Sequence, residues 1–225
     1  MSFNPAQISA VVFDMDGVLL DTEILYKKVT FIAAEQFGFA MTEELHLSTV
    51  GVPADGSEKI MRAGMPQNFP FEEFDAAWRK MLKQELHKHV PVKSGVVDLL
   101  TWLNANNVPA AVATSTDFEA AHDHLKRADL AKHFSAIVTR GDVQQGKPHP
   151  EPFLTAAARL SMDPEDCLAL EDSHNGVRAA HAAGMKTVMV PDLLAPTDEI
   201  RALCSGVASN LAEIERTFRA HHQNG

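Results

Sequence analysis

The chain has 225 residues, 45% of them hydrophobic, which is enough for one large domain or for a core domain with a smaller inserted one. Its formal net charge is -10 and no stretch concentrates lysine and arginine, which argues against nucleic acid as a partner. No apolar run approaches the ~18 residues that span a membrane, and the first residues lack the pattern of a signal peptide. We therefore expect a monomeric cytoplasmic protein that binds neither membranes nor nucleic acid.

Short apolar runs predict the buried strands of a parallel sheet. In chain order they cover residues 10–13, 109–114, 136–138, 167–170 and 187–190. Helical patterns lie between them, at residues 95–103, 118–128, 151–160 and 176–183. This alternation is typical of an α/β fold, and we expect a Rossmann-like parallel sheet with right-handed crossovers.

The interval between the first and second predicted strands has a different character. Phenylalanines and a tryptophan recur there at spacings closer to helical than to strand, at positions 31, 37, 39, 69, 71, 74 and 78. We expect a mostly helical cap domain at residues 21–90, inserted into a catalytic core domain of residues 1–20 and 91–225. The tail, residues 221–225, is expected to be frayed.

Polar side chains follow three of the predicted strands, at the sheet edge where open α/β folds bind ligands. They are Asp14, Asp16, Thr114, Ser115, Glu171 and Asp172. Converging carboxylates repel by about 4 kcal/mol per pair at ~4 Å and an effective dielectric of about 20. A divalent cation with oxygen ligands, such as Mg²⁺, offsets this repulsion. Lys147, in a glycine-lysine-proline loop, and a threonine hydroxyl would then hold phosphate oxygens.

Four segments carry these residues. They read FDMDGVLLDTE at residues 13–23, VATST at 112–116, GKPHPEPF at 146–153 and LEDSHNG at 170–176. In this order they resemble the four motifs of the haloacid dehalogenase-like superfamily, in particular its β-phosphoglucomutase and pseudouridine 5'-phosphatase-like members with a helical cap. Each motif alone is modest support, but the four together are highly specific and cover nearly the whole chain.

The resemblance implies a Mg²⁺-dependent phosphatase that forms an aspartyl phosphate. Asp14 would be the nucleophile and Asp16 the general acid and base. Phosphate binding would fall to Thr114, the Ser115 amide and Lys147, which would also neutralise the nucleophile and the transferring phosphoryl group. The implied metal ligands are Asp14, the Asp16 carbonyl, Asp172 and Glu171, the last either directly or through water.

The close alternative is a β-phosphoglucomutase-like phosphohexomutase. The mutase carries an arginine in the cap loop and a histidine in the first cap helix, where this chain has Ala54 and Tyr26. Both departures favour a phosphatase of small phosphorylated metabolites, such as a sugar phosphate or a nucleotide-like monoester. A phosphoacceptor signalling module would be about half this length and would lack Asp16, and a non-catalytic binding protein would not need every catalytic side chain.

Overall fold

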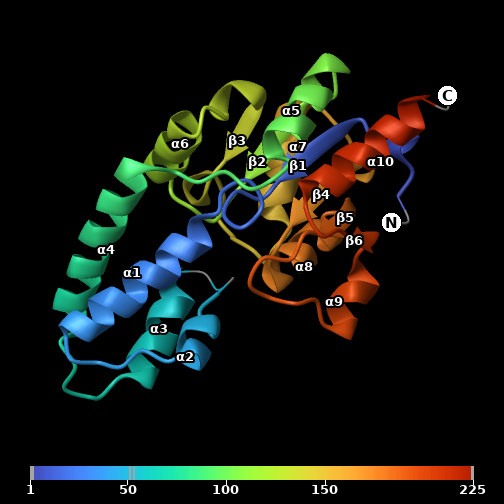
Figure 1. Cartoon of the computed structure of the whole chain (residues 1–225). Coiled ribbons are helices and arrows are strands. Elements are labelled where there is room, and N and C mark those ends of the chain that lie inside the picture. The colour runs from blue at the N-terminus through green and yellow to red at the C-terminus, as the bar shows by residue number, and fades with distance from the viewer. Residues whose placement is uncertain (1–2, 51, 53, 224–225) are drawn as a thin grey trace.

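The computed structural model describes residues 3–50, 52 and 54–223 (Figure 1). Within these residues, six parallel strands form one sheet in the order β3-β2-β1-β4-β5-β6. The strands are β1 (Ala10–Phe13), β2 (Ala110–Ala113), β3 (Ala136–Val138), β4 (Cys167–Glu171), β5 (Lys186–Met189) and β6 (Gly206–Val207). The predicted α/β fold with a parallel sheet is confirmed, and β6 is an additional strand that the sequence did not predict.

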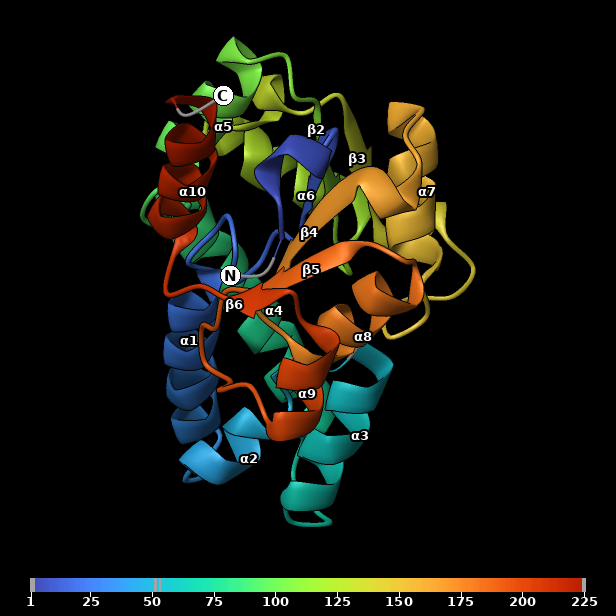
Figure 2. The same ribbon diagram turned by 90° about the vertical axis from the view of Figure 1, so that its right-hand side faces the viewer.

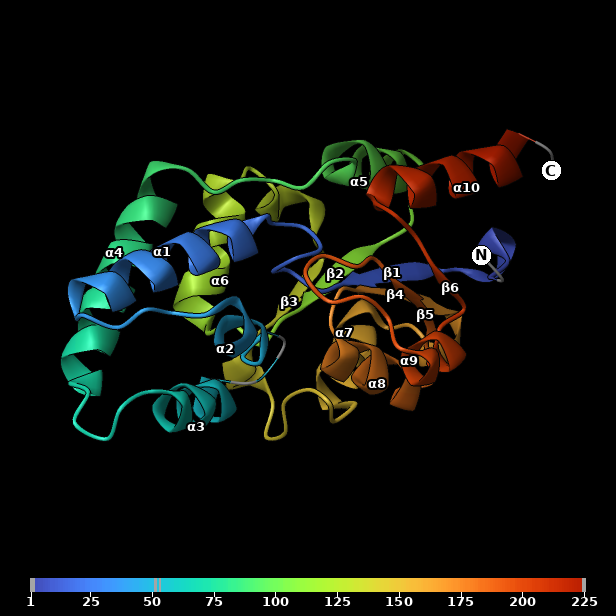
Figure 3. The same ribbon diagram turned by 60° about the horizontal axis from the view of Figure 1, so that its bottom comes forward.

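Helices cover both faces of the sheet (Figures 2 and 3). They are α5 (Val96–Ala105), α6 (Phe118–Arg127), α7 (Glu151–Leu160), α8 (His174–Ala182), α9 (Asp198–Leu203) and α10 (Leu211–Gln223). Alternate residues of β1 face opposite ways, as the period of a strand requires: Val11 and Phe13 pack with α5, α6 and α10, and Ala10 and Val12 pack with α7 and α8. This burial on both faces explains why β1 is apolar throughout.

The interval between β1 and β2 is helical, as predicted. It contains α1 (Thr22–Gln36), α2 (Glu43–Leu47), α3 (Ala54–Gly64) and α4 (Phe71–Lys88). Figure 1 shows these helices together at one end of the molecule. Phe71 and Phe74 are buried in a separate hydrophobic cluster with Ala33 and Ala34 of α1, which confirms that the aromatic residues of this interval form its core.

Two connections join this helical part to the sheet, and they run side by side. Leu20 and Val92 form an antiparallel bridge. The Asp21 amide donates to the Pro91 carbonyl at 2.9 Å, and the Lys93 amide donates to the Leu19 carbonyl at 3.0 Å. The start of α1 is thereby fixed beside the loop that follows β1.

The prediction of a frayed tail is wrong for residues 221–223, because α10 continues to Gln223. Aromatic packing explains the difference: Phe218 is buried with its ring centroid 5.1 Å from that of Trp102, and the His222 ring contacts Trp102 edge-on at 6.2 Å. Among the described helices, none has the length and apolar character that crossing a membrane requires.

Candidate active site

The predicted site residues come together at the carboxyl ends of β1, β2 and β4. These strands are neighbours, with β1 in the centre, so Asp14 after β1 lies between the Thr114 end of β2 and the Glu171 end of β4. The first crossover leads from β1 to β2 on one side, and β4 lies on the other, so the strand order reverses here. This reversal point is where open α/β sheets bind their ligands.

Lys147 joins two of the carboxylates. Its Nζ donates a short hydrogen bond to Asp14 Oδ1 and another, at 2.6 Å, to Glu171 Oε1. All three side chains are buried, with Glu171 fully inaccessible. A buried ammonium bonded to two carboxylates is fixed in position, so Lys147 can hold a negatively charged group beside Asp14.

The charges of this cluster do not balance. Burial raises the pKa of Asp14 from 3.8 to about 8; Lys147 opposes this rise and Glu171 adds to it. Burial also raises the pKa of Asp172 well above its ordinary value, with further contributions from Glu171 and Asp14. Burial alone would lower the pKa of Lys147, but the two carboxylates bonded to it raise that pKa instead. One ammonium therefore does not neutralise three buried carboxylates, and the site favours an added positive charge.

Asp16 is held by hydroxyl groups from two different parts of the chain. Thr22 at the start of α1 donates to Oδ1 at 2.7 Å, and Thr116 after β2 donates to Oδ2 at 2.8 Å. The sequence did not predict these contacts, although both threonines lie within the motif segments. Each oxygen of Asp16 thus accepts a hydrogen bond, which orients the carboxylate next to Asp14.

The predicted phosphate-binding residues lie on the adjoining loop. Thr114 is buried and its hydroxyl accepts a hydrogen bond from the Thr116 amide at 3.1 Å. Ser115 is exposed at the same strand end. The predicted capping of the next helix also occurs there, through Asp117, whose Oδ1 accepts from the Ala120 amide at 3.0 Å.

Two glycines make room for the carboxylates. Gly17 has a φ of +87°, and a Cβ there would lie 2.2 Å from Asp172 Oδ2. The loop of Asp14, Asp16 and Gly17 therefore lies directly against the Asp172 carboxylate. Glu171 is equally confined, because a Cβ on Gly176 would lie 1.6 Å from its Oε1.

The donor chemistry of this cluster fits Mg²⁺, which prefers carboxylate oxygens. Asp14 and Asp172 supply such oxygens on the two sides of the tight contact at Gly17. Glu171 is less available, because Lys147 is bonded to Oε1 and the amide and hydroxyl of Ser173 are bonded to Oε2 at 2.8 and 3.0 Å. As the side chains stand, no three His, Cys, Asp or Glu residues in the described part of the chain are grouped to hold a metal ion. The predicted metal ligands therefore stay a prediction.

Replacing Gly176 by alanine tests how tightly Glu171 is held. Alanine in place of glycine normally stabilises a helix by about 1 kcal/mol, but here the added Cβ would collide with a carboxylate that Lys147 and Ser173 hold in place. We expect a loss of about 1–3 kcal/mol in the free energy of unfolding and a loss of phosphatase activity. Urea denaturation and steady-state kinetics measure the two effects.

Gly141→Ala is the matched control, because the nearest atom to its new Cβ is the Thr139 hydroxyl at 4.0 Å. This variant should keep both stability and activity. A Gly176→Ala protein as stable and active as the control would show that Glu171 is not confined by this helix.

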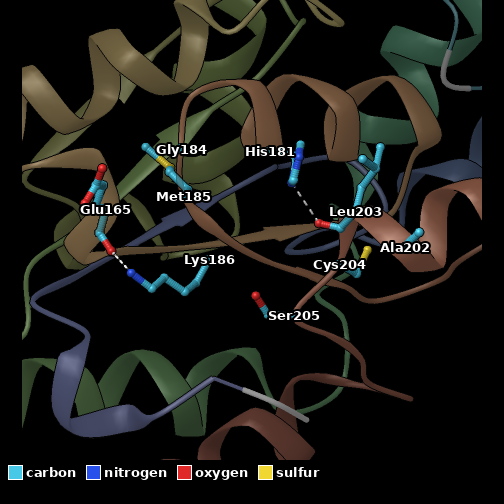
Figure 4. Close-up of a pocket in the computed structure, with 9 residues that line it drawn as sticks. All are labelled: Glu165, His181, Gly184, Met185, Lys186, Ala202, Leu203, Cys204 and Ser205. Atoms are coloured by element: carbon cyan, nitrogen blue, oxygen red, sulfur yellow. Dashed lines mark hydrogen bonds between the residues drawn. The ribbon is translucent and has the colours of Figure 1, made fainter.

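A separate hollow lies at the opposite edge of the sheet (Figure 4). Its lining residues precede the strands β4, β5 and β6, and they are Glu165, His181, Gly184, Met185, Lys186, Ala202, Leu203, Cys204 and Ser205. In Figure 4 the Lys186 ammonium points to the Glu165 carbonyl and the His181 ring to the Leu203 carbonyl. The amino ends of parallel strands are not where such folds bind substrates, so the cluster around Asp14 is the candidate site.

The evidence on the mutase alternative divides between two places. The loop of residues 51–55, which includes Ala54, lies outside the described residues at Gly51 and Pro53, so the prediction drawn from it stays a prediction. Tyr26 is described and lies in α1, with its ring stacked on Trp78 at a centroid distance of 6.0 Å.

Comparisons with known proteins agree with this geometry. Residues 11–190 match the profile of the family described as haloacid dehalogenase-like hydrolase. A phosphorylated carbohydrates phosphatase of Thermotoga maritima is 35% identical over 181 residues, which covers 80% of this chain and 84% of the relative. The (DL)-glycerol-3-phosphatase 2 of Arabidopsis thaliana is 36% identical over 206 residues, which covers 84% and 85% of the two chains.

A solved structure is similar over almost the whole chain. The crystal structure of a protein assigned as a beta-phosphoglucomutase, also from Thermotoga maritima, superposes with a TM-score of 0.80 at 32% identity. The match covers 95% of this chain and 99% of that one. The relatives therefore include both of the activities between which the sequence left a choice.

Proposed function

The chain belongs to the haloacid dehalogenase-like hydrolase family and is a phosphoric monoester hydrolase, and we propose that it hydrolyses a small phosphorylated metabolite through an aspartyl phosphate on Asp14. One observation carries the proposal: Lys147 is buried between Asp14 and Glu171, with Asp16 alongside. A sugar phosphate or a nucleotide-like monoester is the proposed substrate class.

The proposed reaction has two steps. Asp14 Oδ attacks phosphorus, and the bond from phosphorus to the ester oxygen breaks while Asp16 gives that oxygen a proton. Asp16 then takes a proton from water, which attacks the aspartyl phosphate and releases inorganic phosphate. The hydroxyls of Thr22 and Thr116 keep Asp16 oriented in both steps.

Positive charge is needed throughout, because the nucleophile and the phosphoryl group are both anionic. Lys147 provides part of it from a fixed position beside Asp14, and the Thr114 hydroxyl and Ser115 amide lie on the loop that would bind phosphate oxygens. Asp14, the Asp16 carbonyl and Asp172 would hold Mg²⁺, with Glu171 acting through Lys147 or a water. A bound Mg²⁺ would supply charge neutralisation and polarise the phosphoryl oxygens.

We also propose the division of labour between the two parts of the chain. Residues 1–20 and 91–225 carry the catalytic groups, and residues 21–90 form the cap that determines which substrate enters. The paired connections at Leu20 and Val92 support this boundary. The start of α1 reaches the catalytic centre, since Thr22 contacts Asp16.

Hydrolysis and mutase chemistry predict different products. A mutase must hold the second phosphate of a bisphosphate intermediate, typically with a charge-assisted contact of about 1.5–3 kcal/mol, and Ala54 cannot provide one. We therefore expect net phosphate release from small monoesters with no need for a bisphosphate activator. The measurement is phosphate release across a panel of phosphorylated metabolites with magnesium, and it also tests the proposed function.

The contrasting assay uses β-glucose 1-phosphate, magnesium and a trace of glucose 1,6-bisphosphate. Glucose 6-phosphate formed faster than phosphate is released from any monoester would establish the mutase instead. Asp14→Asn is the blank for both assays, because neither reaction proceeds without the nucleophile.

A further inference from the structure

One face of α1 looks toward the catalytic loop. Thr22, Tyr26 and Thr30 are four residues apart and therefore lie on the same side of the helix. The hydrogen bond from Thr22 to Asp16, 2.7 Å long, fixes the direction of this side. Tyr26 follows one turn later, about 5–6 Å further from the sheet, and so lies on the side from which a leaving group would extend.

The Tyr26 ring is held rigidly by the cap. It stacks on Trp78 of α4 at a centroid distance of 6.0 Å and an interplanar angle of 28°. The Trp78 indole donates to the Thr30 hydroxyl at 2.9 Å, and that hydroxyl donates to the Tyr26 carbonyl at 2.8 Å. In the described part of the chain, no side chain hydrogen-bonds the phenol. Tyr26 thus offers a fixed hydroxyl to a ligand.

Carboxylates lie around this phenol. Burial raises the pKa of Tyr26 well above its ordinary value, and three nearby carboxylates raise it further, those of Asp16, Glu23 and Asp117. Asp117 belongs to the core, at the start of α6, and the next residue, Phe118, leaves 58% of its surface exposed. The phenol therefore lies between the cap and an acidic, aromatic end of α6.

The lysines of this region are already bonded to carboxylates. Lys147 contacts Asp14 and Glu171, and Lys93 contacts Asp192 at 2.7 Å. A second phosphate or a carboxylate on the substrate would meet Asp117 and Glu23 with like charge, which is how a site rejects a competing ligand. Hydroxyl groups, in contrast, donate to carboxylates and accept from a phenol.

We propose that Tyr26 and Asp117 determine specificity, and that they select a leaving group that is uncharged and rich in hydroxyls, such as the polyol or sugar part of a monophosphate. This inference rests on the proposed phosphatase function. It narrows the substrate class to neutral carbohydrate-like alcohols and excludes substrates with a second anionic group.

A pair of small substrates tests the role of charge. Glycerol 3-phosphate has an uncharged leaving group, and 2-phosphoglycolate has a leaving group of similar size with a carboxylate. We expect kcat/KM to favour glycerol 3-phosphate by at least about tenfold, and Asp117→Asn to reduce this preference about fivefold, since it removes the charge and keeps an N-cap side chain. The control is Asp163→Asn, which removes the same charge from the N-cap of the 3₁₀ helix Pro164–Asp166 and should leave the preference unchanged.

Tyr26→Phe tests the hydroxyl while keeping the ring stacked on Trp78. We expect KM for glycerol 3-phosphate to rise about tenfold, and the ratio of its kcat/KM to that for p-nitrophenyl phosphate, which has no aliphatic hydroxyls, to fall accordingly. Thr217→Val, which removes a hydroxyl that donates to the Glu213 carbonyl within α10, should change neither value.

Three results would overturn the inference. One is a wild-type preference for 2-phosphoglycolate, another is an unchanged preference in Asp117→Asn, and the third is an equal loss with both esters in Tyr26→Phe, which would indicate a structural role. Wild-type protein that hydrolyses none of the three esters would overturn the proposed function, and this inference with it.

Discussion

Replacing Asp14 by asparagine is expected to lower kcat by more than about 10³-fold while leaving the protein folded. Asparagine has the same shape as aspartate and can still accept the hydrogen bond from Lys147, but its amide does not attack phosphorus. The measurement is hydrolysis of p-nitrophenyl phosphate with magnesium. Activity within tenfold of the wild type would show that another residue is the nucleophile.

The same substitution has a stability consequence whose sign follows from the pKa of Asp14. Folding raises this pKa from 3.8 to about 8, so the folded protein binds the proton more tightly, and the contribution of Asp14 to stability falls as pH rises between those two values. Asparagine removes this dependence. Without metal, the melting temperature at neutral pH should therefore equal or exceed that of the wild type, and it should vary less with pH.

Asp98→Asn is the matched control for both measurements. Asp98 is exposed in the first turn of α5, away from the catalytic groups, so its replacement should keep wild-type activity and the wild-type pH dependence of melting. An Asp14→Asn protein that melts well below this control would mean that the negative charge of Asp14 supports the fold, contrary to the direction of its pKa shift.

The fold was largely predictable because its central strands are buried on both faces. Such strands are continuously apolar, as in Ala10–Phe13 and Ala136–Val138, and the structure places strands at those residues. The strand Gly206–Val207 was not predicted, because it has two half-buried residues and no apolar run. The end of α10 was also missed, since its order comes from Phe218 packing on Trp102, a contact between residues far apart in sequence.

The composition of the candidate site was predictable from the strand ends, but its hydrogen bonds were not. Asp14, Lys147 and Glu171 come together because parallel neighbouring strands end at one edge. The bonds from Thr22 and Thr116 to Asp16 depend on how α1 and the loop after β2 approach each other, which no local pattern records. The family and the enzyme class were predicted and are confirmed, since the motifs occur in order along the chain.

Removal of divalent metal is expected to abolish activity, and magnesium is expected to restore it. The buried carboxylates of Asp14, Glu171 and Asp172 share one ammonium, and the raised pKa values of Asp14 and Asp172 reflect that excess of negative charge. An added divalent cation relieves it. Activity after treatment with EDTA should fall to the level of Asp14→Asn and return on titration with MgCl₂. Full activity in a rigorously metal-free preparation would contradict the mechanism.

Binding itself has a readout that does not depend on turnover. If Mg²⁺ binds the folded protein alone, unfolding becomes harder by about 2.7 kcal/mol at a hundredfold excess over Kd, so the melting temperature should rise with magnesium. Asp172→Asn should reduce this rise, because it removes a ligand that lies against the loop at Gly17. Calcium should raise the melting temperature yet inhibit turnover, since its larger and more flexible coordination shell misplaces Asp14 relative to phosphorus. Calcium that supports turnover as well as magnesium does would show that the position of Asp14 does not depend on the size of the cation.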